Sequence, residues 1–152
     1  RGASAAQLAQ AQALLERLDA VVASALDAED FAAYVQHNER LHALLIEMAG
    51  SALLAREFAR TVQMPFASPN GFVMAQAGIP EARLILTLAQ DQHRQVIEAI
   101  ALRQGARAEA LMREHARLAQ RNFRYALRDR QAIDRVRGGA LILAAGQPRT
   151  RA

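Results

Sequence analysis

The fold class is decided by residues 91–115, which read DQHRQVIEAIALRQGARAEALMREH. Apolar side chains recur at helical spacing on both sides of Gly105, so the stretch predicts two long helices joined by a tight turn. His93 lies twelve residues before Gly105 and His115 lies ten residues after it. At about 1.5 Å of rise per residue, two antiparallel helices would bring the two imidazole rings to a similar height.

Helical spacing continues along the rest of the chain. The predicted helices span residues 5–26, 28–49, 51–63, 80–104 and 106–137, with a short helical turn at 72–77. We therefore expect an all-α fold, an antiparallel helical bundle of about six helices with a central metal or ligand cavity. The predicted domain covers residues 5–137, and residues 138–152 are expected to form a flexible C-terminal tail.

Capping residues mark several of the predicted helix ends. Asp27 suits the N-cap of the second helix, but no full capping box is expected because Asp30 stands where Glu or Gln is usual. Gly50 suits the C′ position after that helix. Pro80 fits the first turn of the long fourth helix, and Gly105 is expected to end it.

Composition limits the class of protein. With 152 residues, of which 52% are apolar, the chain predicts one folded domain. It has no cysteine, which excludes disulfides and thiolate metal sites and fits a cytoplasmic location. No apolar run is long enough to cross a bilayer, and the N-terminus lacks the apolar core of a signal peptide.

The formal net charge is +4, and arginines are crowded between Arg103 and Arg137. A basic surface can indicate nucleic-acid binding. Here the arginines alternate with acidic residues, namely Glu109, Glu114, Asp129 and Asp134. This pattern favours a solvated helix face with local ion pairs over a surface that reads DNA.

Three histidines are placed to meet inside the bundle. His42, like His93 and His115, has apolar neighbours at helical spacing, and Asn38 lies one turn before it on the same face. Neutral imidazole is the commonest protein ligand for zinc and related metals, so the pattern predicts a metal-centred pocket. His37 points away from this face and is interpreted as a surface or dimer-contact residue.

Two other interpretations remain open for these residues. A single buried histidine is more often a hydrogen-bonded core residue than a metal ligand. Three histidines with an open coordination position can also activate water, which would make the protein a metal-dependent enzyme. However, Ser51 and Ser68 have no nucleophile context, and Asp91 has no spacing that assigns it as a general base.

The motifs resemble one family. Asn38-Glu-Arg-Leu-His42 followed by Ala49-Gly50-Ser51, and His93, Val96, Ala99, Ile100, Ala108, Met112 and His115, are similar to the FCD effector-binding domain of GntR-family regulators of the FadR type. The resemblance covers about residues 5–127. It implies an all-α antiparallel bundle that binds a small carboxylate in a central cavity, often at a divalent metal held by one Asp and three His.

Carried over by position, that resemblance implies Asn38, His42, His93 and His115 as metal ligands, with zinc, nickel or another divalent transition metal. The chain departs from the family pattern at three positions. Gln92 replaces a Glu, Ser51 replaces an Asn, and Asn38 replaces the ligand Asp. The last replacement should weaken metal binding without abolishing it. The Pro65–Pro69 loop is similar to that of vanillate-type repressors.

The resemblance also implies partners and a mechanism. Such regulators normally carry a winged helix-turn-helix DNA-binding domain, and neither that domain nor the first effector-domain helix is recognisable here, so the chain is expected to be a fragment. Asn122 shares the face of His115 and is expected to bind the effector, as is Arg60, which is otherwise a surface residue. We expect a homodimer in which the effector controls DNA binding; a purely structural metal is the alternative.

Overall fold

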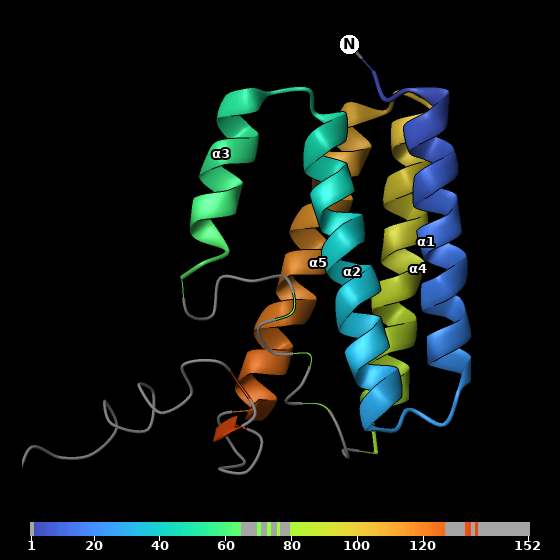
Figure 1. Ribbon diagram of the computed structural model, residues 1–152, viewed down its shortest axis with the longest axis vertical. Helices are drawn as coiled ribbons and strands as arrows, with labels where there is room; N and C mark the ends of the chain where they lie inside the picture. Colours follow the sequence, from blue (N-terminus) through green and yellow to red (C-terminus); the bar gives the residue numbers. More distant parts are fainter. Residues whose placement is uncertain are drawn as a thin grey trace, which may run out of the picture.

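The computed structural model describes residues 2–64, 70, 73, 76, 80–126, 133, 134 and 136, without the side chains of residues 122, 123, 125 and 126. Within these ranges it contains five helices and no strand (Figure 1). They are α1 (Ala5–Ala23), α2 (Ala28–Met48), α3 (Ala52–Thr61), α4 (Ala82–Ala101) and α5 (Gly105–Ala126). The all-α prediction is confirmed. The predicted turn at 72–77 and the helix after Ala126 fall largely outside the described residues.

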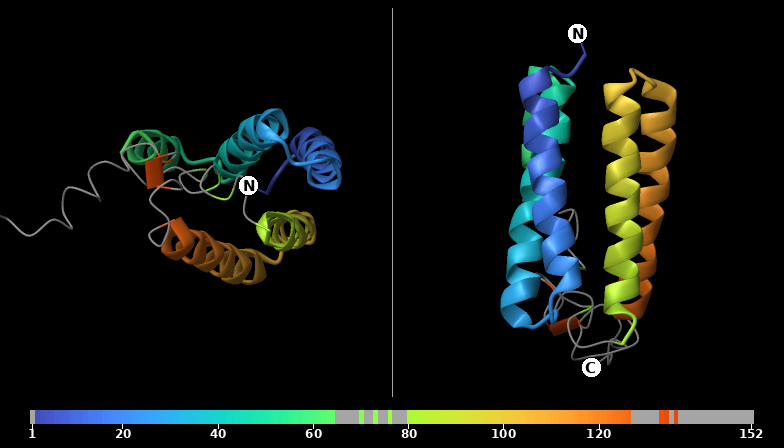
Figure 2. Two further views of the ribbon diagram at one scale, coloured as in Figure 1. Left: turned by 90° about the horizontal axis from the view of Figure 1, so that it is seen from below. Right: turned by 90° about the vertical axis from the view of Figure 1, so that its right-hand side faces the viewer.

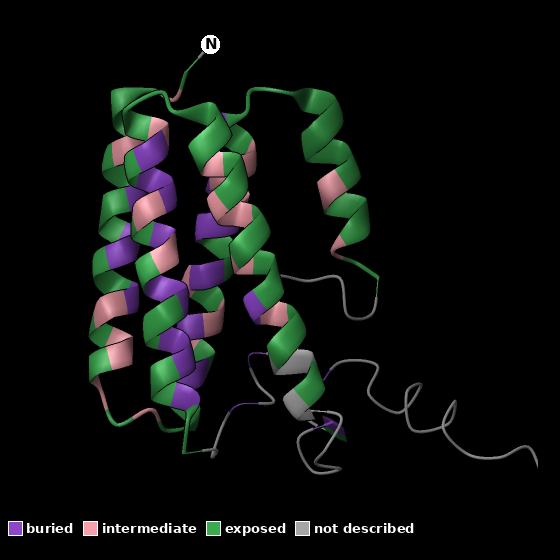
Figure 3. Ribbon diagram, turned by 180° about the vertical axis from the view of Figure 1, so that it is seen from behind, coloured by how far each residue is buried: buried purple, intermediate pink, exposed green. Residues whose placement is uncertain are grey.

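The helices form two layers. Helices α1 and α2 make one antiparallel pair, and α4 and α5 make a second pair that packs against it (Figure 2). Helix α3 extends beside the first pair and has no buried residue (Figures 1 and 3). The predicted six-helix count and central cavity are not seen in the described part of the chain.

The core lies between the layers. Its buried apolar residues include Leu14, Leu15 and Leu18 of α1, Phe31, Tyr34, Leu41 and Leu44 of α2, and Leu86 and Ile97 of α4. Each large apolar side chain buried in this way contributes about 1.5–3 kcal/mol. A smaller cluster of Ile85, Ala89 and Leu118 joins α4 to α5. The packing of these clusters sets how far each helix is shifted along its axis. It therefore sets which inward-facing polar residues lie opposite each other.

The connection between α1 and α2 is short, and a side chain of α4 holds its first residues in place. The hydroxyl of Ser24 donates to the carbonyl of Val21 at 2.6 Å where α1 ends. Arg83 of α4 donates to the carbonyls of Val22 and Ser24, which satisfies acceptors at the end of α1. Helix α1 therefore ends at Ala23, three residues earlier than its apolar spacing predicts.

The N-terminus of α2 has a full capping box. Asp27 accepts hydrogen bonds from the amides of Glu29 and Asp30 at 2.8 and 2.9 Å, as an N-cap should. Asp30 in turn accepts from the amide of Asp27 at 3.2 Å. The expectation of an incomplete box was wrong, because the shorter carboxylate of Asp30 reaches the N-cap amide without the extra methylene of Glu.

The turn between α4 and α5 also differs from expectation. Gly105 is the first residue of α5, and the chain reverses at Leu102–Gln104. Arg103 has a φ of 57°, and the amide of Gln104 donates to the carbonyl of Ala99 at 2.8 Å. This is a Schellman motif in which an arginine occupies the position that usually holds glycine. By contrast, Gly50 is in the C′ position predicted for it, with a φ of 64°.

No helix among the described residues combines the length and apolar character that a membrane span requires.

Candidate metal centre

Three histidines from three helices converge inside the bundle. His42 of α2, His93 of α4 and His115 of α5 each offer a ring nitrogen, and these nitrogens all lie within 4.8 Å of one another. The ring centroid of His42 lies 5.4 Å from each of the other two, and those two lie 4.5 Å apart. The predicted convergence of the three rings is therefore confirmed, and they are close enough to hold one metal ion.

The matched heights of His93 and His115 follow from the α4–α5 pair. Their Nε2 atoms lie 3.2 Å apart, although the residues are 22 positions apart in sequence. Both helices run straight away from the turn at Leu102–Gln104, so residues at similar offsets from the turn face each other. His42 comes from the opposite layer and closes the group.

A glutamine fixes the tautomer of His93. The Nε2 group of Gln90 donates to the backbone carbonyl of Leu15 at 2.9 Å, so its Oε1 is the atom that faces the ring. Oε1 lies 3.1 Å from Nδ1 of His93. An amide oxygen only accepts, so Nδ1 carries the hydrogen and Nε2 presents its lone pair to the cluster.

A second glutamine acts in the same way on His115. Oε1 of Gln92 lies 3.0 Å from Nδ1 of His115, so with the amide in this orientation Nδ1 donates and Nε2 is again the lone-pair atom. Two neutral rings with this arrangement place two lone pairs 3.2 Å apart. Such a contact is repulsive unless a proton or a metal ion lies between the nitrogens. The polar residues around the rings therefore orient them as ligands, in the manner of an outer shell around a metal.

Two further buried polar atoms, from residues one turn apart on α2, have no hydrogen-bond partner among the described residues. They are Nε2 of His42 and Oδ1 of Asn38, and both are fully buried. Nδ2 of Asn38 donates to Oδ1 of Asn70 at 2.7 Å, and Asn70 donates to the carbonyl of Val35 at 2.9 Å. An unsatisfied buried acceptor costs about 1–3 kcal/mol, so a ligand that bonds to both atoms would stabilise the folded domain.

The electrostatics keep the three rings neutral. Burial lowers the pKa of His42 to about 3, with a further contribution from the neighbouring His115. Burial lowers the pKa of His93 well below its usual value, and the pKa of His115 is lowered for the same reason. At neutral pH the imidazoles are therefore in the form that coordinates metals.

The other predicted residues lie in different surroundings. His37 is half-buried and is not in the three-histidine group, as expected. Arg60 on α3 is exposed and lies 3.8 Å from Glu57. Asp91 is exposed and accepts a hydrogen bond from Gln95 at 2.6 Å. The side chain of Asn122 lies outside the described residues, so its role, like that of Arg60, stays a prediction.

Sequence reasoning missed several polar residues of the core. Gln90 and Asn70 orient a histidine and an asparagine, and Gln76 is 1% exposed with neither polar atom paired to a described residue. Only Gln90 left a signal, because it lies three residues before His93 and so on the same helix face. The partners of Asn70 and Gln76 depend on how distant segments pack.

These observations define an all-α domain with a buried, preorganised three-histidine cluster. The family model of the FCD domain matches residues 1–118 of this chain. The chain therefore belongs to the FCD family, the regulatory effector-binding domain of GntR-type transcription factors. FCD is a regulatory domain of transcription factors, which are typically not enzymes. A comparison with curated proteins gave no match.

Proposed function

We propose that this domain senses a small carboxylate effector at a divalent metal and thereby controls DNA binding by a GntR-type regulator. The proposed metal ligands are His42, His93 and His115, with Oδ1 of Asn38 in the fourth position. The observation that carries the proposal is the pair of Nε2 lone pairs held 3.2 Å apart by the bonds from Nδ1 to Gln90 and Gln92. The unpaired Nε2 of His42 and Oδ1 of Asn38 support it independently.

The donor set favours a borderline transition metal. Imidazole nitrogens with one amide oxygen suit zinc first and nickel or related ions second. All four proposed ligands are neutral, so the metal would keep its full double charge. The charge of the metal would attract a carboxylate effector strongly, because water screens charges little in a buried site.

Further parts of the proposal extend beyond the histidine cluster. Asn122 and Arg60 are proposed effector contacts, and Arg60 would have to leave its present position near Glu57. Effector and DNA are the partners that the FCD family implies in general. The finer parts of this proposal are DNA binding through a winged helix-turn-helix domain, a homodimer, and membership of the vanillate-repressor-like subgroup.

Elemental analysis of the purified domain tests the metal, and a thermal-shift screen of small carboxylates with and without chelator tests the effector. Near-stoichiometric metal and a chelator-sensitive shift with one class of acid would support the proposal. His93→Ala should lower bound metal and effector affinity together, whereas His37→Ala, on the neighbouring face of α2, should change neither. If His93→Ala loses the metal but keeps the effector, the metal does not bridge them.

The same measurements separate the two rival functions. A purely structural metal would be retained stoichiometrically with no response to any acid. A metal-dependent enzyme would be expected to place a carboxylate near the metal, whereas among the described residues the group close enough to hold a metal contains histidines alone. Turnover of an acid or ester that is lost in His93→Ala would support the enzyme over the sensor.

A further inference from the structure

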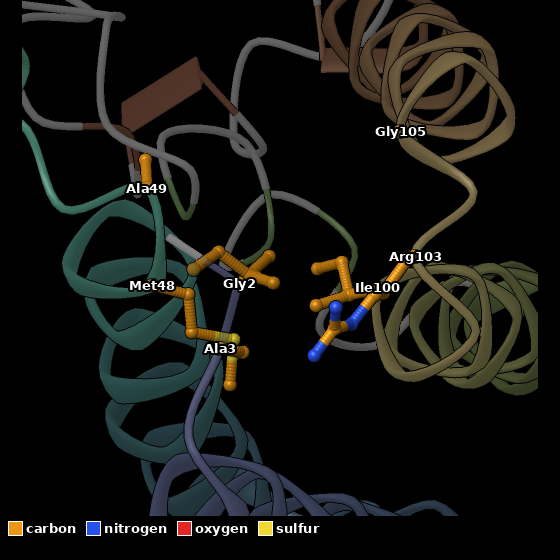
Figure 4. A pocket seen from close by; sticks show the side chains of 8 residues that line it. Gly2, Ala3, Met48, Ala49, Ile100, Arg103 and Gly105 are labelled. Carbon is orange, nitrogen blue, oxygen red and sulfur yellow. The ribbon is translucent and has the colours of Figure 1, made fainter.

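A pocket lies at the end of the bundle, away from the histidines. It has a volume of about 430 Å³ and is formed by the N-terminal segment, the end of α2 and the α4–α5 turn (Figure 4). Leu45, Met48 and Ile100 give it apolar walls, and Gly2 and Ala3 lie along one side. This volume is in the range of sites for small organic ligands, which are about 300–1,000 Å³.

A single cation faces this apolar pocket. The guanidinium of Arg103 projects into it in Figure 4, and its Nε lies 3.9 Å from where a Cβ on Gly2 would be. No acidic residue lines the pocket, and Arg103 has no ion pair with any described residue. By contrast, nearby Arg107 contacts Glu98 at 3.2 Å. Arg103 thus places a positive charge beside the apolar walls of the pocket, with no counterion among the described residues.

The backbone at Arg103 adds a second, independent observation. Its φ of 57° is in the left-handed region, where a side chain costs about 1–2 kcal/mol that glycine would avoid. Backbone strain of this kind clusters at functional sites, and the other described non-glycine residue with it is Leu26, with a φ of 59° in the α1–α2 connection. The turn needs no guanidinium from Arg103, because backbone hydrogen bonds close it, from the amides of Arg103 and Gln104 to the carbonyls of Ile100 and Ala99.

We propose that this pocket binds an amphipathic monocarboxylate, with its carboxylate on Arg103 and its apolar body against Leu45, Met48 and Ile100. One guanidinium matches one carboxylate and can bind it through two parallel hydrogen bonds. The site is separate from the metal centre, because none of the three histidines lines the pocket and Arg103 lies beyond the C-terminal end of α4, ten residues after His93. It therefore adds a second ligand site to the domain.

Octanoate is the probe, titrated into the isotopically labelled domain in the presence of chelator and followed by backbone amide shifts. We expect saturable shifts at Ala3, Met48 and Ile100, and much weaker binding of 1-octanol, which lacks the charge. Arg103→Gln should weaken octanoate binding about tenfold or more, as loss of a charge-assisted hydrogen bond implies. Arg113→Gln, which removes an equal charge from an exposed part of α5, should leave it unchanged.

A second variant keeps the charge and reduces the space. Ala3→Leu retains Arg103 and should also weaken octanoate binding, while butyrate binds poorly to all variants. Equal binding to Arg103→Gln and the parent domain would overturn the proposal, and so would shifts centred on His42, His93 and His115. Shifts of the pocket residues on dilution without ligand would assign the pocket to contact between copies of the chain and would also overturn it.

Discussion

Gln90 links His93 to the first helix. Its Oε1 accepts from Nδ1 of His93 at 3.1 Å, and its Nε2 donates to the carbonyl of Leu15 at 2.9 Å. One amide thus fixes both the tautomer and the orientation of the ring, from a contact between residues 75 positions apart. The metal affinity that we propose should therefore depend on a residue that does not itself coordinate.

Replacing Gln90 tests this dependence. Gln90→Leu should weaken zinc binding by about 10- to 100-fold, the usual effect of losing an outer-shell partner of a metal-bound histidine. Competition with a chromogenic chelator would measure it. Gln95→Leu is the matched control, since Gln95 lies on the same helix and its side chain donates to Asp91 rather than to a residue of the histidine cluster. Unchanged affinity in a folded Gln90→Leu variant would contradict the outer-shell role.

Changing one side-chain group of Asn38, from amide to carboxylate, should change the zinc affinity of the domain. Asn38→Asp supplies an anionic oxygen where the unpaired Oδ1 lies, so zinc affinity should rise by about tenfold or more. Without metal the same variant should be less stable, because an unpaired buried carboxylate is costly. Metal titration by calorimetry and thermal unfolding in chelator would check the two effects. A variant whose metal affinity equals that of the parent would remove Asn38 from the ligand set.

The pH dependence of the chelated domain has a defined sign. The folded pKa values of His42, His93 and His115 are lowered, so below about pH 6.5 the unfolded chain binds more protons than the folded domain. Stability should be fully present above about pH 6.5 and should be lost as the pH falls toward about 3, where His42 titrates. The slope per histidine approaches about 1.4 kcal/mol per pH unit.

Urea unfolding of the chelated domain between pH 7.5 and about 4.5 would measure this slope. A variant with His42, His93 and His115 replaced by glutamine should have a flatter dependence in that range. A parent profile that is flat between pH 6.5 and about 4.5 would show that the rings are not held neutral by the fold.

Two turns should give stability changes of opposite sign. Arg103→Gly should stabilise the domain by about 1 kcal/mol, because glycine adopts the left-handed conformation without a clash. Gly50→Ala should destabilise it by about 1 kcal/mol, although a Cβ there meets no atom within 4 Å. Denaturant unfolding measures both. Equal signs would mean that backbone conformation does not govern these turns.

These same two turns show what could be predicted from the sequence. Gly50 marks its turn because glycine is the usual C′ residue, and the prediction holds. The second turn is closed by Arg103, which carries no such signal, so Gly105 was mistaken for its closing residue. Helix periods and the matched offsets of His93 and His115 are local features, and they predicted the α4–α5 pair correctly.

The remaining errors concern contacts between distant segments. The bond from Gln90 to Leu15 and that from Asn38 to Asn70 join positions 75 and 32 residues apart, and no spacing rule predicts them. The meeting of His42 with the other two histidines was predicted from its inward-facing position and from the chemistry of a shared metal, because no spacing rule sets its height against theirs. Arg60 could not be judged from sequence, because an arginine on a short amphipathic helix suits a binding site and a solvent-exposed face equally well.

The division of the histidines between the two layers affects the order of folding. Each helix pair is built from contacts between sequence neighbours, which form early. His93 and His115 belong to one pair and His42 to the other, so all three rings meet only when the pairs dock. Full coordination is thus gained in the last folding step, and the rate at which zinc becomes resistant to a chelator during refolding should report docking rather than helix formation.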